Sequence, residues 1–274
     1  MSSIQSILVH MDASPRSAMR LAIARELARR QGAEMVCALL ALEPPLMPAV
    51  ETVPPTLITQ IESDRRTAAR ALFDDVLAEG SPPMAWDEVV GDTPVHGFVE
   101  AALYFDLMVL GQQKRDDLLA VDVPPGFVSD VLLDSGKPAL IVPYAGEFET
   151  VATDVLIAWK PTRECARAVA CAIPLLQQAK KVQVLSWSGA EPAPAELTYG
   201  IRRYLGWHGI DAEVRRYAEV PDDLGELLLS RVADEGADLL VMGCYGHSRL
   251  RELVLGGVTR VILESMTCPV LMAH

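Results

Sequence analysis

The sequence predicts an α/β protein made of two repeated, doubly wound domains, each with a five-stranded parallel sheet. A length of 274 residues suits two domains of about 100 to 150 residues each. Short β-rich runs alternate with segments of helical period along the whole chain, and this alternation is typical of a parallel sheet between two layers of helices. The same order of runs restarts in the second half, which indicates an internal repeat.

In the first half, expected strands and helices alternate. The strands are expected at 7–11, 35–42, 85–90, 106–111 and 138–143. The helices are expected at 18–30, 60–79, 94–104 and 127–135, the first with its Arg and Glu residues on the outer face. Ser14 can cap the first helix, and Pro15 suits its first position. The Pro-rich segment 43–55 is too stiff and too poor in N–H donors for a helix, so we expect a loop there.

The second half repeats the first at a nearly constant spacing. Three strand runs recur at offsets of 148, 132 and 131 residues: 7–11 as 155–159, 106–111 as 238–243, and 138–141 as 269–272. Offsets that drift so little indicate a duplicated domain with small deletions in the second copy. We therefore expect a first domain over residues 1–147 and a second over residues 151–274, separated by a short polar stretch.

Composition and charge exclude several classes of protein. Half of the residues are hydrophobic and 22% are charged, which provides buried cores and argues against a disordered chain. There is no apolar run of about 18 residues, and the first six residues lack the basic start of a signal peptide, so we expect a cytoplasmic protein without membrane contact. A net charge of −13 opposes binding to nucleic acids.

Cysteine and histidine spacing gives no support for a disulfide framework or a metal site. The five cysteines form no CxxC pair and lie mostly in apolar segments, as reduced core thiols do. The five histidines show no ligand spacing, so no metal is expected. We expect Trp159, Trp187 and Trp207 to fill the interface between helices and sheet or a pocket wall.

A glycine-rich loop follows the run 238–243, at the sheet edge where doubly wound proteins bind ligands. Gly256 and Gly257 precede a helix, and the free amides and positive dipole end of a helix N-terminus attract anions. Glycine there lets a phosphate approach the backbone, while Gly243 and Gly246 allow a sharp exit from the strand. From spacing alone, an anion site and simple turn glycines explain this pattern about equally well.

The chain resembles the universal stress protein family in its tandem-domain form, over nearly its whole length. The family's nucleotide signature is G-x2-G-x9-G followed by Ser or Thr; Gly243, Gly246 and Gly256 keep this spacing, and Gly257 takes the place of the hydroxyl residue. The runs 237–249 and 267–272 are also typical of the family. The resemblance implies an adenine-nucleotide-hydrolase-like fold in each half, binding of ATP or a related adenine nucleotide, and dimerisation through the last strands. It leaves the role of Mg²⁺ open.

The resemblance also implies a set of residues for the nucleotide site of the second half. Beside the glycines, this set includes Val258 and Thr259. The hydroxyl group of Thr259 can take the place of the one that is missing at Gly257. Arg249 is the best placed side chain for bidentate pairing with a phosphate.

At the end of the first strand the family places an Asp near the adenosine, and the two halves differ there. This residue is Asp12 in the first half and Lys160 in the second. Lysine cannot accept a hydrogen bond. Three accounts stay open for Lys160: an acceptor for adenosine is missing, the ammonium pairs with the phosphates, or the side chain faces water. We expect the first, in which Asp at this position would tighten ATP binding.

The first half is expected to be a degenerate copy that does not bind nucleotide. Gly111 is not followed by the second glycine of the signature, and the stretch that ends at Gly126 is two residues longer than its counterpart. Within it, Asp116, Asp117 and Asp122 would repel phosphates.

These observations favour a stress-response protein that binds an adenine nucleotide in its second half and acts through conformational change or partner docking. No catalytic residue is assigned, because the chain has no G-x4-G-K-(S/T) P-loop. Two alternatives stay open: a module that binds another small ligand or a protein around Lys160, and a slow ATP-hydrolysing enzyme. We also expect self-association, with the runs 139–142 and 270–272 pairing the two halves and covering sheet edges. A homodimer of the whole chain stays open.

Overall fold

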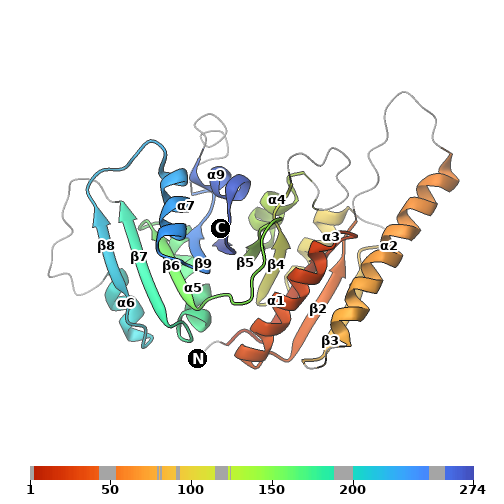
Figure 1. Cartoon of the computed structure of the whole chain (residues 1–274), viewed down its shortest axis with the longest axis horizontal. Helices are drawn as coiled ribbons and strands as arrows, with labels where there is room; N and C mark the ends of the chain where they lie inside the picture. The colour runs from red at the N-terminus through yellow and green to blue at the C-terminus, as the bar shows by residue number, and fades with distance from the viewer. Residues whose placement is uncertain are drawn as a thin grey trace. The chain divides into compact units, whose positions relative to one another are not determined.

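The computed structural model describes residues 3–42, 54–78, 80, 82–90, 93–114, 123, 125–187, 200–246 and 257–274. Contacts divide the chain into two compact units, Met1–Glu147 and Phe148–His274 (Figure 1). None of the helices in the described part of the chain combines the length and apolarity that crossing a bilayer requires. The five cysteines are free thiols, and within the described ranges no cluster of His, Cys, Asp or Glu could hold a metal ion.

Strands and helices alternate in both units. The first contains β1 (Ser6–Met11), α1 (Arg16–Gln31), β2 (Met35–Leu40), α2 (Pro55–Leu77), β3 (Met84–Glu88), α3 (Pro94–Ala102), β4 (Leu107–Gly111), α4 (Phe127–Ser135) and β5 (Ala139–Val142). The second contains β6 (Asp154–Trp159), α5 (Arg163–Leu176), β7 (Lys181–Trp187), α6 (Ile201–Trp207), β8 (Glu213–Tyr217), α7 (Leu224–Asp234), β9 (Leu239–Gly243), α9 (Val258–Ser265) and β10 (Val270–Ala273).

The strand order confirms the predicted fold class of two repeated, five-stranded parallel sheets. The first unit has the order β3-β2-β1-β4-β5. Read from its other edge, the second unit has the matching order β8-β7-β6-β9-β10. In the second unit β6 pairs in parallel with β7 on one side and β9 on the other. The chain thus winds in two directions from β6, and the crevice between the carboxyl ends of β6 and β9 is a topological switch point, where such folds bind ligands.

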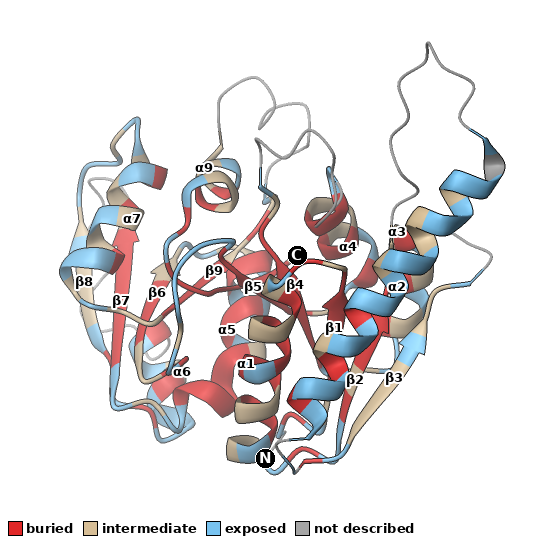
Figure 2. Cartoon of the chain, turned by 45° about the vertical axis from the view of Figure 1, so that its right-hand side comes forward, coloured by how far each residue is buried: buried red, intermediate tan, exposed pale blue. Residues whose placement is uncertain are grey.

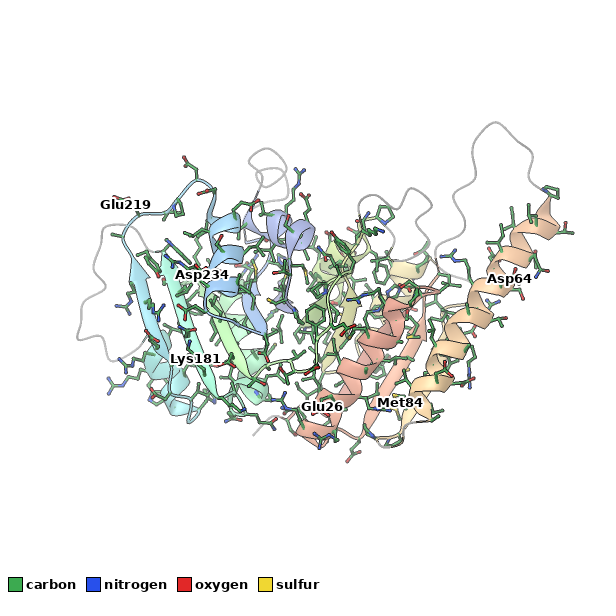
Figure 3. The ribbon with its side chains drawn as sticks, in the orientation of Figure 1. Glu26, Asp64, Met84, Lys181, Glu219 and Asp234 are labelled. Atoms are coloured by element: carbon green, nitrogen blue, oxygen red, sulfur yellow. The ribbon has the colours of Figure 1, made fainter. Side chains whose placement is uncertain are left out.

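The central strands of each unit are mostly buried, while the edge strands β3 and β8 and the outer faces of the helices are partly exposed, as Figure 2 shows. In β1 every residue after Ser6 is buried, which a strand covered by helices on both faces requires. The helix α1 ends at Gly32 with φ of 67°, a left-handed conformation that glycine adopts without strain. By contrast, α2 is exposed along most of its length, and Asp64, labelled in Figure 3, is one of its exposed residues.

Three local expectations differ from the structure. The helix α2 begins at Pro55, within the segment expected to be a loop, because proline fits the first turn of a helix; residues 43–53 lie outside the described ranges. Ser14 does not cap α1. Its backbone N–H instead donates to Asp12 Oδ1 at 2.8 Å, so the Asp12 carboxylate organises the turn. Arg20, expected on the outer face of α1, is only 2% exposed.

Candidate functional site

A cavity of about 580 Å³ opens at the switch point of the second unit. The loop after β6, the start of α5, the ends of β7 and β9, α7 and the start of α9 all line it. Its volume lies within the range of small-molecule sites, about 300 to 1,000 Å³. The structure brings six of the predicted site residues to this cavity: Lys160, Gly243, Gly246, Gly257, Val258 and Thr259. The other two, Arg249 and Gly256, lie outside the described residues.

The glycines after β9 make room for the start of α5. A Cβ atom at Gly243 would lie 2.5 Å from the backbone nitrogen of Cys165, so no larger residue fits there without moving the helix. A Cβ atom at Gly246 would lie 3.2 Å from Oε2 of Glu164. The left-handed residue of this turn is Tyr245, with φ of 53°, and neither glycine has a positive φ. Neither glycine therefore supplies a left-handed residue for the exit from the strand, and the close approach of the α5 backbone explains the glycine at Gly243.

The N-terminus of α9 faces the same cavity. Gly257 occupies the N-cap position in an extended conformation and provides no side-chain cap. Gly257, Val258 and Thr259 all line the cavity, and the first amides of a helix lack partners within the helix. The hydroxyl of Thr259 accepts a hydrogen bond from the backbone N–H of Tyr245 at 3.3 Å. Thr259 thus anchors the loop after β9, a role that its position in the sequence did not indicate.

Glu164 is the site residue that sequence analysis missed. It lies in the first turn of α5, lines the cavity and is only 3% exposed. Burial raises the pKa of its carboxyl group, but hydrogen bonds from Arg163, from its own backbone N–H and from Thr162 outweigh burial and lower the pKa overall. The bond from Arg163 Nε to Oε1 is 2.6 Å long. Glu164 is therefore a carboxylate at neutral pH. Its signal in the sequence was an acidic residue two positions after the N-cap Thr162.

Two tryptophans form an aromatic wall of the cavity. Trp159 ends β6 and Trp187 ends β7, and both line the cavity as expected. The Trp187 ring stacks on Tyr217 of β8, with 5.0 Å between ring centroids and 17° between ring planes. The Arg231 guanidinium lies over the other ring of this pair, 5.9 Å from the Tyr217 centroid. Trp207, in contrast, is 66% exposed, so its expected place in the interior is wrong.

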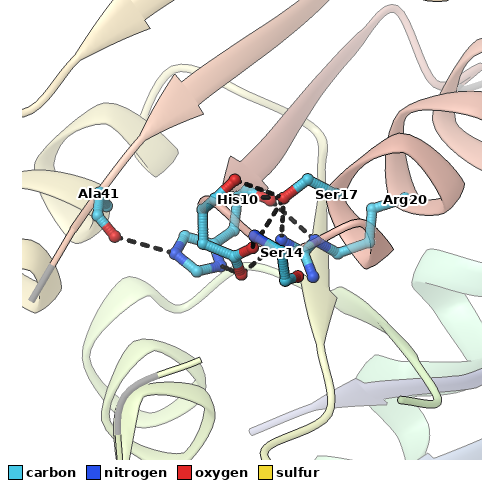
Figure 4. Close-up of polar contacts among 6 residues, drawn as sticks. His10, Ser14, Ser17, Arg20 and Ala41 are labelled. Carbon is cyan, nitrogen blue, oxygen red and sulfur yellow. Dashed lines mark hydrogen bonds and ion pairs between the residues drawn. The ribbon is translucent and has the colours of Figure 1, made fainter. Parts of the chain in front are cut away.

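In the first unit, a buried ion pair occupies the place that corresponds to the cavity at the switch point of the second unit. Arg20 Nη2 donates to Asp12 Oδ2 at 2.7 Å, and Arg20 Nε donates to the backbone oxygen of His10 at 2.8 Å (Figure 4). Arg20 also packs on Gly111 at the end of β4, where a Cβ atom would lie 2.5 Å from its Nη1. The remaining cavity measures about 10 Å³. The second unit carries Ala168 at the equivalent position, 148 residues later, so its switch point stays open.

His10 and Asp12 extend this buried network. His10 Nε2 is 3.1 Å from the backbone oxygen of Ala41, and the ring packs on Phe127 with 4.4 Å between centroids. Burial and the nearby Arg20 lower the pKa of His10 to about 4, so the ring is neutral at pH 7. Burial raises the pKa of Asp12, but Arg20, His10 and the hydrogen bonds of Ser14 together lower it. Asp116, Asp117 and Asp122, expected to repel phosphates, lie outside the described residues.

The neutral His10 makes stability depend on pH. An unfolded chain binds a proton on His10 below about pH 6.5, while the folded chain does so only below about pH 4, so stability falls as pH decreases through this window. We expect a loss of about 3 kcal/mol between these pH values. Urea unfolding of the full chain at a series of pH values measures it. His10→Gln, which keeps a donor for Ala41, should flatten the slope, whereas His208→Gln at an exposed position should not. Equal slopes in all three proteins would contradict this account.

Comparisons with known proteins agree with the fold. Residues 154–274 match the model of the Universal stress protein family. A universal stress protein from Synechocystis sp. is 25% identical over 170 residues, which are 61% of this chain. The match spans only 57% of that relative's length.

Solved structures show the same fold over nearly the whole chain. A universal stress protein from Archaeoglobus fulgidus has a TM-score of 0.74 at 18% identity, covering 98% of this chain and 95% of its own. A protein of unknown function from Pseudomonas aeruginosa has a TM-score of 0.60 at 16% identity, covering 98% and 92%. The family model, the relative and the fold agree: residues 154–274 match the universal stress protein family, and nearly the whole chain is similar in fold to a solved universal stress protein.

Proposed function

We propose that the second unit binds an adenine nucleotide, and that the chain is a cytoplasmic stress-response protein whose conformation or partner docking responds to this ligand. The observation that supports the proposal best is the 580 Å³ cavity that Gly243 and Gly246, two glycines of the family's nucleotide signature, line. The N-terminus of α9 is suited to one phosphate group, because its N-cap Gly257 makes no side-chain hydrogen bond and the dipole end of a helix N-terminus is positive. Trp159 and Trp187 offer flat apolar surfaces for a base or a ribose.

We propose further that only the second unit binds nucleotide. Arg20 occupies the switch point of the first unit, and Ala168 leaves that of the second open. Removing Arg20 from its place would break a buried ion pair with Asp12, which is costly unless another charge replaces the partner. Self-association of the whole chain also remains part of the proposal.

Titration calorimetry of the full chain with adenosine, AMP and ATP, each with and without Mg²⁺, tests the proposal. Trp159 and Trp187 line the cavity, so quenching of tryptophan fluorescence provides a second measure of binding at this site. We expect saturable binding of at least one of these compounds with one site per chain. Absence of both heat and quenching with all three would refute nucleotide binding.

A second candidate is a different small ligand, and the α7 side of the cavity favours it. Val220, Leu224 and Leu228 line that side with apolar groups. Mass spectrometry of compounds released from the purified protein distinguishes the two candidates. An adenine nucleotide in the released material supports the first proposal, and an apolar compound without phosphate supports the second.

Lys160 provides a separate prediction. It is exposed and lines the cavity at the end of β6, so its side chain reaches the ligand from the strand that carries Asp12 in the first unit. We expect Lys160→Asp to tighten ATP binding by about 1 kcal/mol or more, because the carboxylate restores an acceptor for hydroxyl groups of the nucleoside. The gain should be larger for adenosine, which has no phosphate to repel. Calorimetry of the wild type and the variant with ATP and with adenosine measures both gains. Weaker binding of ATP by the variant would show that Lys160 pairs with phosphate.

A further inference from the structure

We propose that Tyr217 is a positioning residue of this site: its ring holds the Trp187 indole in place as the wall on which the flat base of a nucleoside stacks. The inference rests on the proposed nucleotide binding by the second unit and adds a residue that does not itself line the cavity. It depends on three features of the described residues: the strand register that brings the two rings together, the geometry of their stack, and the side chains around them.

The pairing of β7 with β8 brings the two rings together. The strands lie side by side (Figure 1), and their register pairs Trp187 with Tyr217, the last residue of each strand. Paired residues of neighbouring strands point to the same face of a sheet. This is the face that α7 covers, because the guanidinium of Arg231, a residue of α7, lies over the Tyr217 ring. Both rings therefore lie under α7, at the carboxyl ends of their strands.

The stack leaves one face of the Trp187 indole for a ligand. The two ring planes are nearly parallel, 17° apart, so the Tyr217 ring covers one face of the indole. Trp187 lines the cavity, whereas Tyr217 is not among the described residues that do so. A flat group in the cavity can therefore stack only on the other face of the indole. Leu224 and Leu228 of α7 line the same cavity with apolar side chains, which suit a base better than a sugar or a phosphate.

Tyr217 acts on the ligand through Trp187. A tryptophan side chain has several rotamers, and a stacked partner ring favours the one that keeps the two rings parallel. An indole that is already ordered loses less conformational entropy when a base stacks on it, so binding is tighter. This role needs the ring of Tyr217 and not its hydroxyl group. Phenylalanine should therefore replace it without loss, and an aliphatic side chain should not.

The test measures the affinity of adenosine, which carries the base without a phosphate, by titration calorimetry of the full chain and its variants. Trp187→Leu should bind about tenfold less tightly, because it removes the stacking surface. Tyr217→Leu should bind about fivefold less tightly, and Tyr217→Phe should bind as the wild type does. Combining Trp187→Leu with Tyr217→Leu should give the affinity of Trp187→Leu alone, because no indole is left for Tyr217 to hold.

Tyr204→Leu is the matched control for Tyr217→Leu. Tyr204 also belongs to an aromatic pair of the second unit, with 4.9 Å between its centroid and that of His208, and it is not among the described residues that line the cavity. Adenosine affinity should be unchanged in this variant. If thermal unfolding shows that Tyr217→Leu does not fold, Tyr217→Val repeats the test with a side chain that favours strands.

The outcomes separate this inference from the proposed function. If the wild type binds neither adenosine, AMP nor ATP, the proposed function fails and the inference fails with it. If adenosine binds equally well to the wild type and to Trp187→Leu or Tyr217→Leu, the nucleotide site stands and the role of Tyr217 is refuted. A double variant that binds more weakly than Trp187→Leu, or an equal loss in Tyr204→Leu, refutes it as well. Loss in Tyr217→Leu, retention in Tyr217→Phe and no added loss in the double variant support it.

Discussion

Replacement of Asp12 by Ala is expected to destabilise the first unit by about 3 to 5 kcal/mol, the usual cost of leaving a buried charge without its partner. Asp12 is fully buried and Arg20 is 2% exposed, so water cannot solvate the guanidinium that remains. The change also removes one of two acceptors for the Ser17 hydroxyl, Asp12 Oδ1 at 2.8 Å, while the backbone oxygen of residue 12 remains at 2.9 Å. Denaturant unfolding of the full chain, followed by circular dichroism, measures the loss.

Two further variants show whether the buried charge is the cause. Asp12→Asn combined with Arg20→Met removes both charges and keeps much of the volume, so it should recover a large part of the lost stability. Glu26→Ala is the surface control, because the Arg29–Glu26 pair on the same helix is exposed and should contribute less than about 1 kcal/mol. A cost for Asp12→Ala no larger than that of Glu26→Ala would contradict the importance of the buried pair.

Replacement of Gly257 by Glu is expected to weaken nucleotide binding by about 100-fold or more, since it places bulk and a negative charge where the phosphate should lie. The fold should survive, because Gly257 has an extended backbone that any residue adopts, and a carboxylate at the N-terminus of α9 stabilises the helix. Calorimetry with AMP and ATP measures the effect.

Gly206→Glu in α6 is the matched control for this change. A Cβ atom at Gly206 would meet nothing within 4 Å, and this residue does not line the cavity. Affinity should therefore be unchanged in this variant. If the Gly257 variant bound both nucleotides as the wild type does, the phosphate site at α9 would be wrong, whatever the stability of the variant.

The sequence predicted the repeated fold because its signals are local. Strand runs and helical periodicity are properties of neighbouring residues, and the second half repeats these local patterns; together they were sufficient for the fold class and for the strands of the first half. The start of α2 at Pro55 was missed because proline disfavours a helix interior but fits its first turn. In that case the same residue type signals both a loop and a helix start.

The site was predictable only in part, because its remaining features depend on contacts between distant segments. Glycine spacing identified one side of the cavity. Arg20 has the charge of a surface residue, and nothing near it in the sequence shows that Asp12 turns it inward. Glu164 meets Gly246 only because β6 and β9 pair, which brings residues about 80 positions apart into contact. Contacts of this kind can be identified only from the folded structure.

The difference between Arg20 and Ala168 has a consequence for the thermodynamics of the whole chain. By mass action, a ligand that binds one unit stabilises that unit alone, by about 2.7 kcal/mol at a concentration 100 times its dissociation constant. The first unit already contains its counterion within the polypeptide, so under the proposal its stability would not vary with the concentration of this ligand. The second unit has an open cavity, and its stability would rise and fall with the supply of the proposed ligand. The two halves of this duplicated fold would then differ in one property. The stability of the first half would be constant, and the stability of the second half would depend on the concentration of the ligand around it.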